Sequence, residues 1–549
     1  MRFLNLLLLL FAIHSLCPTA QASPFMPHDG VLRFYRLALP VTSTCYNQSF
    51  DGSASSVYEF WDETEDFLNQ IYLPLGFCME VVRDDRLIQE TPNLIDQNPF
   101  DASAWGTDLT NAIIGTKAYD VGLWISEPAD WDNSGGAILG GAYSATTKGG
   151  GYSQPNTTTV AHELGHLFGA VHTHDSGAAT EPGMGQSVMG YGMPANFFSL
   201  ASIKAIFEMN QQRNAAYYSD GARTQLVGTN AGGNYVYGIV PAFNEAPYIY
   251  AEQMREHYKI PQGSCFAFPI YASDPEGDLL TYAFQQYEDG ATFHAYGPSE
   301  TAVVDFRPQY TLFPYDDYLF INDGTDIPAM TPGTYRFLAA VNDLPPRHRM
   351  HPQAMREAPF VSKYAVAQTS VEIVAGTPFT ATLSPSKSHY EAGEVVTLNW
   401  GINTSLFTAD TRLRISLSDN YGETFDYLLA EHVPALQGSC SITLPHISFD
   451  CINHTFGEGE RSVRPGILRI DVEGSIAYTL TCLHPEAQGA AGGFTMSGEL
   501  PSSIAQLTTH GSSTTYRLNG TPVSPNHQQS SLTTGCYIRQ GKKIWIRAK

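Results

Sequence analysis

Basic and thiol side chains are scarce in this chain of 549 residues. Lys and Arg number 30 against 54 Asp and Glu, which gives a net charge of −24. Such an excess of negative charge repels phosphate, so we exclude nucleic acid as a partner. Charged residues make up only 15% of the chain and hydrophobic residues 43%. This balance excludes a disordered protein and favours several folded domains.

Cysteine is also rare, with eight residues in the whole chain. If Cys17 is removed with an N-terminal leader, seven remain, which is too few for a disulfide scaffold of this length. Sequence proximity alone favours two pairs, Cys45 with Cys78 and Cys440 with Cys451.

Long hydrophobic runs are absent except at the N-terminus. There Arg2 precedes the mostly apolar residues 3–13, and Ala20-Gln21-Ala22 forms a small-x-small cleavage pattern. The run is too short to span a bilayer, and the pattern is typical of a signal peptide over residues 1–22. We therefore expect no membrane span, and a protein that is secreted or held at the cell surface.

The remaining chain changes character near residue 225. Before it, residues 31–41 are strand-like, and residues 56–76 carry apolar side chains at helical spacing. After it, short alternating runs lie between Gly, Pro and Asp turns, which predicts β-sandwich modules, with Trp400 in a core. The expected domains are a signal peptide, an α+β domain, two all-β modules, and a linker with a tail, at residues 1–22, 23–225, 226–375, 376–485 and 486–549.

The densest chemical signal is the stretch VAHELGHLFGAVHTHD. His162 and His166 are four residues apart, so on a helix they share one face, with Glu163 beside it. Gly169 ends the apolar pattern, and a glycine there allows the sharp turn that would bring His172 back to the first two histidines. The pattern predicts a metal site of three imidazoles.

Zinc is the metal that three neutral imidazoles suit, and three protein ligands leave a position for water. A structural zinc site usually has four ligands, often with cysteine, but no cysteine lies between Cys78 and Cys265. The sequence thus favours a catalytic zinc, with Glu163 as the general base that takes a proton from water.

The segment HELGHLFGAVH resembles the extended zinc signature of the metzincin metallopeptidases. The following SVMGYG, with Met189, is similar to their Met-turn, in which a methionine lies beneath the zinc-binding histidines. The neighbouring residues most resemble bacterial reprolysin-like (adamalysin-type, M12B) members. The resemblance implies an α+β metzincin catalytic domain, a mixed twisted sheet with helices, followed by all-β Ig-like sandwich modules.

Several roles stay open at this point. In some relatives a tyrosine at the place of Tyr191 binds zinc as a fifth ligand or stabilises the oxyanion, but in most reprolysin-like enzymes that position is not a ligand. Packing is the alternative interpretation of Tyr191. His174 fits a supporting position better than a ligand. Asp175 falls three residues after His172, whereas many reprolysins have an aspartate immediately after the third histidine, so the resemblance does not establish a supporting role for Asp175.

A glycine-rich ribbon precedes the histidine helix. It is a candidate edge strand to which an extended peptide substrate adds, and an ordinary loop is the alternative interpretation. The candidate residues are Gly136, Ala137, Ile138, Leu139 and Gly140.

The later modules carry two further hints. Residues 272–284 resemble an Ig/cadherin-like module, where Asp274, Glu276 and Asp278 offer oxygen ligands for Ca²⁺; a solvated acidic turn is the other interpretation. Residues 516–549 resemble C-terminal sorting domains of the type IX secretion pathway, which implies outer-membrane secretion machinery as a partner; a plain β-hairpin cap is the alternative.

The leading hypothesis is a secreted zinc endopeptidase that hydrolyses peptide bonds of protein or peptide substrates. The alternative is a surface adhesin whose metzincin domain is inactive. The presence of Glu163 argues against the adhesin, since an inactive descendant has no need of a general base.

Overall fold

The structure is a computed structural model, and the chain divides into two compact units. Unit 1 holds residues 1–378 and 474–478, and unit 2 holds residues 379–473 and 479–549. The residues that the structure describes are 28–127, 134–174, 179–192, 196–219, 225–230, 235–241, 244–287, 290–293, 295–306, 331–456, 459–481, 493–498, 515–517, 535–539 and 542–546. The predicted signal peptide and most of the predicted linker lie outside them.

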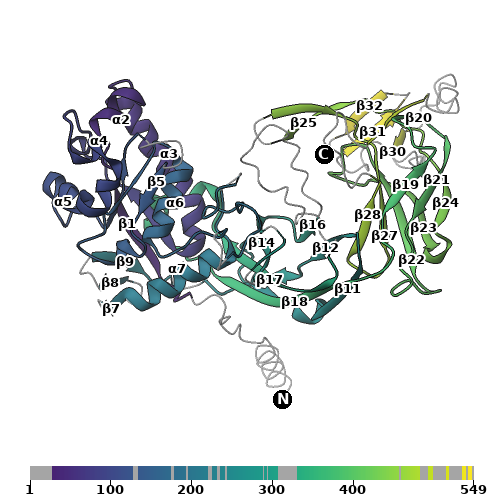
Figure 1. The fold of residues 1–549 in the computed structure, drawn as a ribbon, viewed down its shortest axis with the longest axis horizontal. Coiled ribbons are helices and arrows are strands. Elements are labelled where there is room, and N and C mark those ends of the chain that lie inside the picture. The colour runs from purple at the N-terminus through teal and green to yellow at the C-terminus, as the bar shows by residue number, and fades with distance from the viewer. Residues whose placement is uncertain are drawn as a thin grey trace, which may run out of the picture. The chain divides into compact units, whose positions relative to one another are not determined.

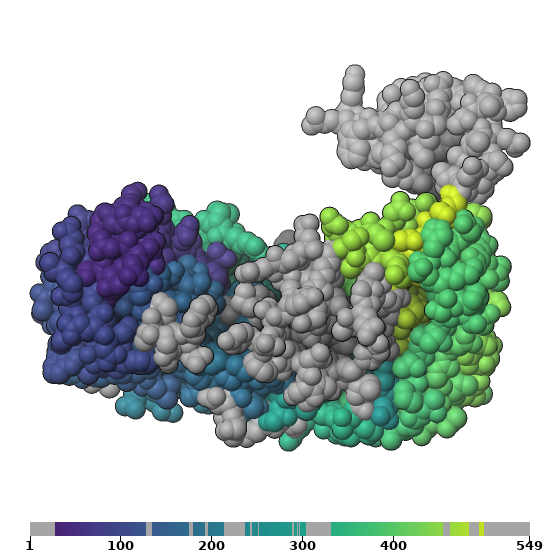
Figure 2. Space-filling model, turned by 45° about the horizontal axis from the view of Figure 1, so that its top comes forward, coloured from purple at the N-terminus to yellow at the C-terminus, as the bar shows by residue number. Residues whose placement is uncertain are grey.

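The N-terminal part of unit 1 is an α+β domain, as the sequence predicts (Figure 1). The helical pattern at residues 56–76 forms a helix from Ala54 to Tyr72, capped by the Ser53 hydroxyl. The helices are α2 (Ser43–Gln48), α3 (Ala54–Tyr72), α4 (Leu94–Gln97), α5 (Ala102–Ile114), α6 (Thr157–Leu167) and α7 (Leu200–Arg213). In the space-filling view, the purple and blue N-terminal residues of this domain form one continuous surface (Figure 2).

Two sheets organise this domain. The larger is mixed, in the order β2-β1-β9-β8-β7 with β3 also on β1, and β1 is parallel to β2 and antiparallel to β9. The smaller has the order β4-β6-β5. The strands are β1 (Leu32–Ala38), β2 (Phe77–Val81), β3 (Val121–Gly122), β7 (Asn214–Ser219), β8 (Gln225–Asn230), β9 (Tyr235–Ile239), β4 (Trp124–Ile125), β5 (Gly135–Ala137) and β6 (Gly151–Ser153).

Buried aromatic rings join α6 to the larger sheet. Phe168, directly after α6, lies with its ring 4.9 Å from that of Tyr35 on β1 and 5.0 Å from that of Phe77 on β2. The Tyr72 hydroxyl of α3 donates to the Ala161 carbonyl of α6 at 2.9 Å. The position of the histidine helix is therefore set by the core.

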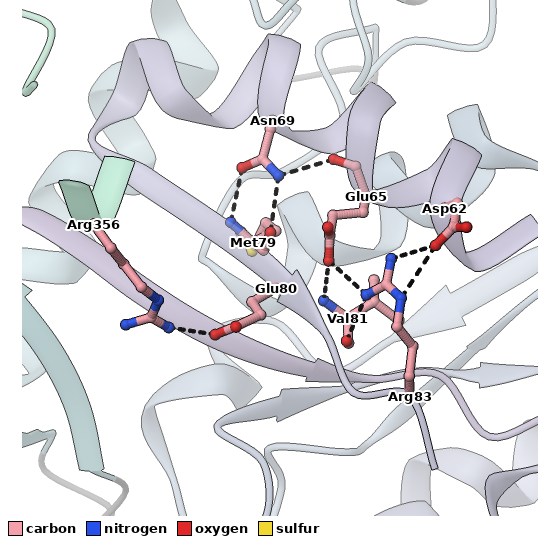
Figure 3. Close-up of polar contacts among 8 residues, drawn as sticks. All are labelled: Asp62, Glu65, Asn69, Met79, Glu80, Val81, Arg83 and Arg356. Atoms are coloured by element: carbon pink, nitrogen blue, oxygen red, sulfur yellow. Dashed lines mark hydrogen bonds and ion pairs between the residues drawn. The ribbon is translucent and has the colours of Figure 1, made fainter. Parts of the chain in front are cut away.

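Polar contacts also fasten α3 to β2 (Figure 3). The Asn69 amide accepts from the Met79 N–H at 2.9 Å and donates to the Met79 carbonyl at 2.8 Å, so it mimics a strand partner. Arg83, two residues after β2, forms an ion pair of 2.8 Å with Glu65 of α3.

The second part of unit 1 is built from strands, which is compatible with the predicted β module. One sheet has the order β11-β18-β17-β14-β15, and β12 pairs with β16 in another. Between these two sheets, the ring centres of Phe268 on β12 and Phe284 on β14 lie 4.4 Å apart. The elements are β10 (Tyr248–Ile249), β11 (His257–Pro261), β12 (Cys265–Pro269), β13 (Ala272–Ser273), β14 (Leu279–Gln286), β15 (Tyr296–Ser299), β16 (Val303–Phe306), β17 (Gly333–Leu344), α8 (Pro352–Glu357) and β18 (Tyr364–Val374).

Unit 2 is also rich in strands. Trp400 is 6% exposed and donates its indole N–H to the Ala435 carbonyl at 2.8 Å, so its predicted core position is confirmed. The strands are β19 (Ala381–Ser384), β20 (His389–Glu391), β21 (Val395–Trp400), β22 (Arg412–Ser418), β23 (Tyr427–Pro434), β24 (Ser439–Thr443), β25 (Ile452–Phe456), β26 (Gly459–Val463), β27 (Ile467–Val472), β29 (Thr495–Ser497), β30 (Thr515–Arg517), β31 (Gly535–Arg539) and β32 (Lys542–Ile546), with β28 (Ala477–Leu480) divided between the units. Among the described residues, no helix combines the length and hydropathy needed to cross a bilayer.

The predicted disulfides are wrong. Cys45, Cys78, Cys440 and Cys451 are all free thiols. Cys45 and Cys78 lie in different apolar clusters, where each packs as a small hydrophobic side chain.

Candidate active site

The helix α6 begins and ends as its sequence dictates. The Asn156 side chain accepts from the amides of Thr158 and Thr159 at 3.0 and 3.1 Å, which caps the first turn. At the other end, Gly169 has φ +105°, and a Cβ there would approach the Met209 side chain to 2.7 Å. Both the backbone angle and the space require glycine, which redirects the chain toward His172.

The three predicted metal ligands converge. One ring nitrogen of each of His162, His166 and His172 lies within 4.8 Å of the others. The His162 Nδ1–H donates to the Val188 carbonyl at 2.6 Å, and the His166 Nδ1–H donates to the Ala170 carbonyl at 2.8 Å. A carbonyl can only accept, so both Nε2 atoms keep a lone pair, as metal ligands need.

Burial keeps His162 neutral. Its side chain is 8% exposed, and desolvation, followed by the neighbouring His166, lowers its pKa to about 3. A neutral imidazole is the form that binds a metal. The three nitrogens fit zinc in number, and His162 fits it in protonation state as well.

Glu163 lies beside the ligands, almost fully buried. Its side chain is 4% exposed, and burial raises the pKa of its carboxyl to about 8. Its Oε2 has no hydrogen-bond partner in the part of the chain that the structure describes. A buried acceptor without a partner is costly, so this oxygen is placed for a water molecule or a substrate group.

Gly135 of β5 makes room for this carboxyl group. A Cβ at Gly135 would lie 2.8 Å from Cγ and Cδ of Glu163. Glycine at this position therefore allows the strand to approach the helix, which places an edge of the smaller sheet directly beside Glu163.

Met189 lies beneath the histidine helix. It is fully buried, and a Cβ at Gly165 would overlap its sulfur atom. The Gly190 N–H donates to the Ser187 carbonyl at 2.8 Å, which closes a tight turn around the methionine. The close contact fits the predicted support role, since Gly165 lies between His162 and His166.

Tyr191 and His174 border the site on its exposed side. The Tyr191 hydroxyl lies 3.1 Å from His172 Nε2, and its side chain is 57% exposed. The His174 ring stacks on His172 with centroids 5.2 Å apart. Both residues contact the His172 ring. Asp175 lies outside the described residues.

The predicted substrate ribbon is only partly a strand. Gly136 and Ala137 belong to β5, which pairs with β6 on one side; the structure describes no strand on its other side. Ile138, Leu139 and Gly140 form a turn instead. The reason is that Gly140 adopts a left-handed backbone angle, φ +71°, and its N–H donates to the His166 carbonyl at 2.8 Å. The predicted strand is thus too long at its C-terminal end.

Glu181 is a residue that the sequence reasoning missed. It is 1% exposed, its Oε1 accepts from the Gln186 N–H at 3.2 Å, and its Oε2 accepts from the Ser187 hydroxyl. It thereby orders the loop that precedes Met189. The available signal was an acidic residue next to a Pro-Gly turn between the two motifs.

A second group of possible ligands lies in the β module. Oxygen atoms of Asp274, Glu276 and Asp278 lie within 4.8 Å of one another. Asp274 Oδ1 accepts from the amides of Glu276 and Asp278 at 2.9 Å, and its buried Oδ2 has no partner among the described residues. Carboxylate oxygens at this spacing suit a hard cation such as Ca²⁺.

A comparison with protein-family models gives one match. Residues 41–202 match the model of metallo-peptidase family M12, in its reprolysin group. This segment includes α6, the three histidines and the Met189 turn. The match supports a reprolysin-like metallopeptidase, and at the level of the family a zinc peptidase, for this part of the chain.

Comparisons with whole proteins add little. No curated protein matches the chain. Among solved structures, a chaperone–substrate complex is 17% identical with a TM-score of 0.25, covering 33% of this chain and 35% of its own, so this chain spans about a third of its length. Fibronectin(III)-like modules of Clostridium thermocellum CbhA are 8% identical with a TM-score of 0.13, covering 43% and 92%. The four N-terminal Ig domains of Dscam1 isoform 6.9 are 10% identical with a TM-score of 0.14, covering 50% and 54%. The Ig-like character of the modules stays a prediction.

Proposed function

We propose that the α+β domain is a zinc-dependent endopeptidase that hydrolyses peptide bonds. The observation that carries the proposal is the convergence of three histidine nitrogens beside the unpartnered Oε2 of Glu163. His162, His166 and His172 would hold the zinc. His162 and His166 each donate a hydrogen bond from Nδ1–H to a main-chain carbonyl, which fixes the orientation of their rings for metal binding.

The catalytic chemistry divides between the metal and Glu163. When bound, zinc supplies a Lewis acid that makes water a nucleophile at neutral pH. Glu163 takes the proton from the attacking water and passes it to the leaving amine. Its burial suits this task, because a pKa raised to about 8 makes the Glu163 carboxylate a stronger base than an ordinary carboxylate, so it takes a proton from water more readily.

Substrate would bind along the side of β5 on which the described residues provide no neighbouring strand. An extended peptide that adds to an edge strand makes main-chain hydrogen bonds that do not depend on its sequence. Gly135 at one end of β5 touches Glu163, so a peptide there passes the general base. Tyr191 would donate to the oxyanion or act as a further ligand, which its distance of 3.1 Å from His172 Nε2 supports.

We also propose that the protein is exported, since residues 1–22 have the pattern of a signal peptide. The tail at residues 516–549 would then address outer-membrane secretion machinery. In the β module, Asp274, Glu276 and Asp278 would bind Ca²⁺ and stabilise their turn, which the unpartnered Oδ2 of Asp274 supports.

The test is cleavage of a mixed peptide library by purified residues 23–549. A zinc chelator should abolish cleavage, and added zinc should restore it. Zinc binding without cleavage of any library peptide would refute the peptidase and favour the adhesin with an inactive metzincin domain. Cleavage that persists in chelator would refute the role of the metal.

A further inference from the structure

One side chain of the β module holds both ends of the segment that carries Met189. This segment, residues 179–192 and 196–200, is called the Met189 segment below. Gln285 of β14 is 1% exposed. Its Oε1 accepts from the Leu200 N–H at 2.7 Å, and its Nε2 donates to the Thr180 carbonyl at 3.4 Å. Bonds to both ends fix their separation.

The bond from the Leu200 N–H to Gln285 Oε1 pairs a main-chain amide at the start of a helix. Leu200 is the first residue of α7, and the first amides of a helix have no partner within it. A buried amide of this kind destabilises the fold when it is left unpaired. Gln285 therefore satisfies the start of α7 from another part of the chain.

The neighbouring hairpin of the module makes further contacts with the segment. Gln286 Oε1 accepts from the amides of Thr292 and Phe293 at 2.8 and 3.2 Å, which orders the chain after β14. From this hairpin, the Gly290 N–H donates to the Ala179 carbonyl at 2.8 Å. The module thus binds the segment through main chain as well as through Gln285.

A short chain of contacts links this attachment to a predicted metal ligand. Three residues before Leu200, the Phe197 carbonyl accepts from the Val188 N–H at 2.8 Å. The Val188 carbonyl in turn accepts from His162 Nδ1 at 2.6 Å. Gly297 of β15 packs against the same Phe197, since a Cβ there would come within 2.6 Å of its ring. Movement at Leu200 would therefore reach the carbonyl that orients His162.

The module also docks on the domain at places far from Gln285. Arg356 of α8 pairs with Glu80 of β2 (Figure 3), and its guanidinium lies 4.5 Å from the centre of the Phe34 ring. Phe207 of α7 and Tyr364 of β18 have rings 6.1 Å apart. Loss of the Gln285 bonds alone would leave these contacts in place.

We infer that Gln285 is a positioning residue of the active site, supplied by the β module, which acts through the Met189 segment on His162. The inference rests on the proposed peptidase function. It makes the module a working part of the peptidase, and not a separate appendage.

The test compares Gln285→Met with the wild type in the full chain. Methionine keeps the volume but removes both hydrogen bonds. We expect kcat to fall about 10-fold with little change in KM, and zinc affinity to fall about 10-fold, because partners behind metal ligands typically contribute 10–100-fold. Hydrogen exchange at the Leu200 amide should accelerate. Gln353→Met, on the exposed side of α8, is the matched control and should match the wild type in every assay.

The outcomes separate the two proposals. A folded Gln285→Met variant with wild-type kcat and zinc affinity would overturn the inference, even if its thermal midpoint falls. If Gln285→Met does not fold, Gly297→Ala, which crowds Phe197, is measured in its place with the same criteria. If the wild type cleaves no peptide, the proposed function fails, while zinc affinity and hydrogen exchange still decide the role of Gln285.

Discussion

Gly165→Ala should reverse the usual effect of replacing a glycine within a helix. In an exposed helix this change stabilises by roughly 0.5–1 kcal/mol, because alanine restricts the unfolded chain. Here the new Cβ would overlap the Met189 sulfur and lie 3.2 Å from the Phe198 ring. Overpacking of a filled core costs about 1–3 kcal/mol. The net expectation is a destabilisation of roughly 1 kcal/mol.

A double-mutant cycle with Met189→Ala isolates this clash. Removing the methionine side chain opens the space that the new Cβ enters, although it destabilises by itself. In the Met189→Ala background, Gly165→Ala should therefore be neutral or stabilising by up to ~1 kcal/mol. The coupling energy between the two changes should be roughly 1–3 kcal/mol.

The cycle is measured by the thermal unfolding midpoints of the wild type, the two single variants and the double variant. The zinc content of each protein is determined on the same samples. At this domain size, 1 kcal/mol corresponds to about 2–4 °C in the midpoint. Gly165→Ala should also bind zinc more weakly, because the helix must shift between two metal ligands. If Gly165→Ala stabilises the wild type, or destabilises both backgrounds equally, the methionine does not support the helix as described.

Three further predictions concern other parts of unit 1. Gly135→Ala should displace the Glu163 carboxyl group and lower kcat about 100-fold while zinc content stays the same, because misplacement by about 1 Å has this effect; a fall in zinc content would contradict it. Burial lowers the pKa of Lys148 to about 8, below its value in the unfolded chain, so the folded state binds fewer protons between about pH 8 and 10.5. Thermal midpoints of the wild type should accordingly rise relative to Lys148→Met over that range, and parallel profiles would argue against it. Millimolar Ca²⁺ should raise the midpoint of the wild type but not of Asp274→Asn, and equal responses would remove the calcium site.

The parts of the site that the sequence predicts are those set by local spacing. His162, Glu163 and His166 follow from helical geometry, and the turn to His172 follows from a glycine that needs a positive φ. The prediction of β5 fails at its end because the bond from the Gly140 N–H to the His166 carbonyl depends on the folded helix.

Contacts between distant residues escaped the sequence analysis. Gln285 and Leu200 are 85 positions apart, and nothing in either local pattern indicates the bond between them. The cysteine pairs fail for the same reason, since proximity in sequence did not place Cys45 and Cys78 in one cluster. Pattern and spacing report local geometry, whereas packing partners depend on the whole fold.

The most direct test of the central claim measures zinc content and kcat/KM on the same samples of wild type and Glu163→Gln. Glu208→Gln, on the exposed side of α7, serves as the control. We predict about one zinc per chain in all three proteins, with kcat/KM lower by about 10²–10⁴-fold in Glu163→Gln alone, which is the usual contribution of a general base. Full cleavage by Glu163→Gln, or a wild type that binds no zinc, would contradict the proposed mechanism.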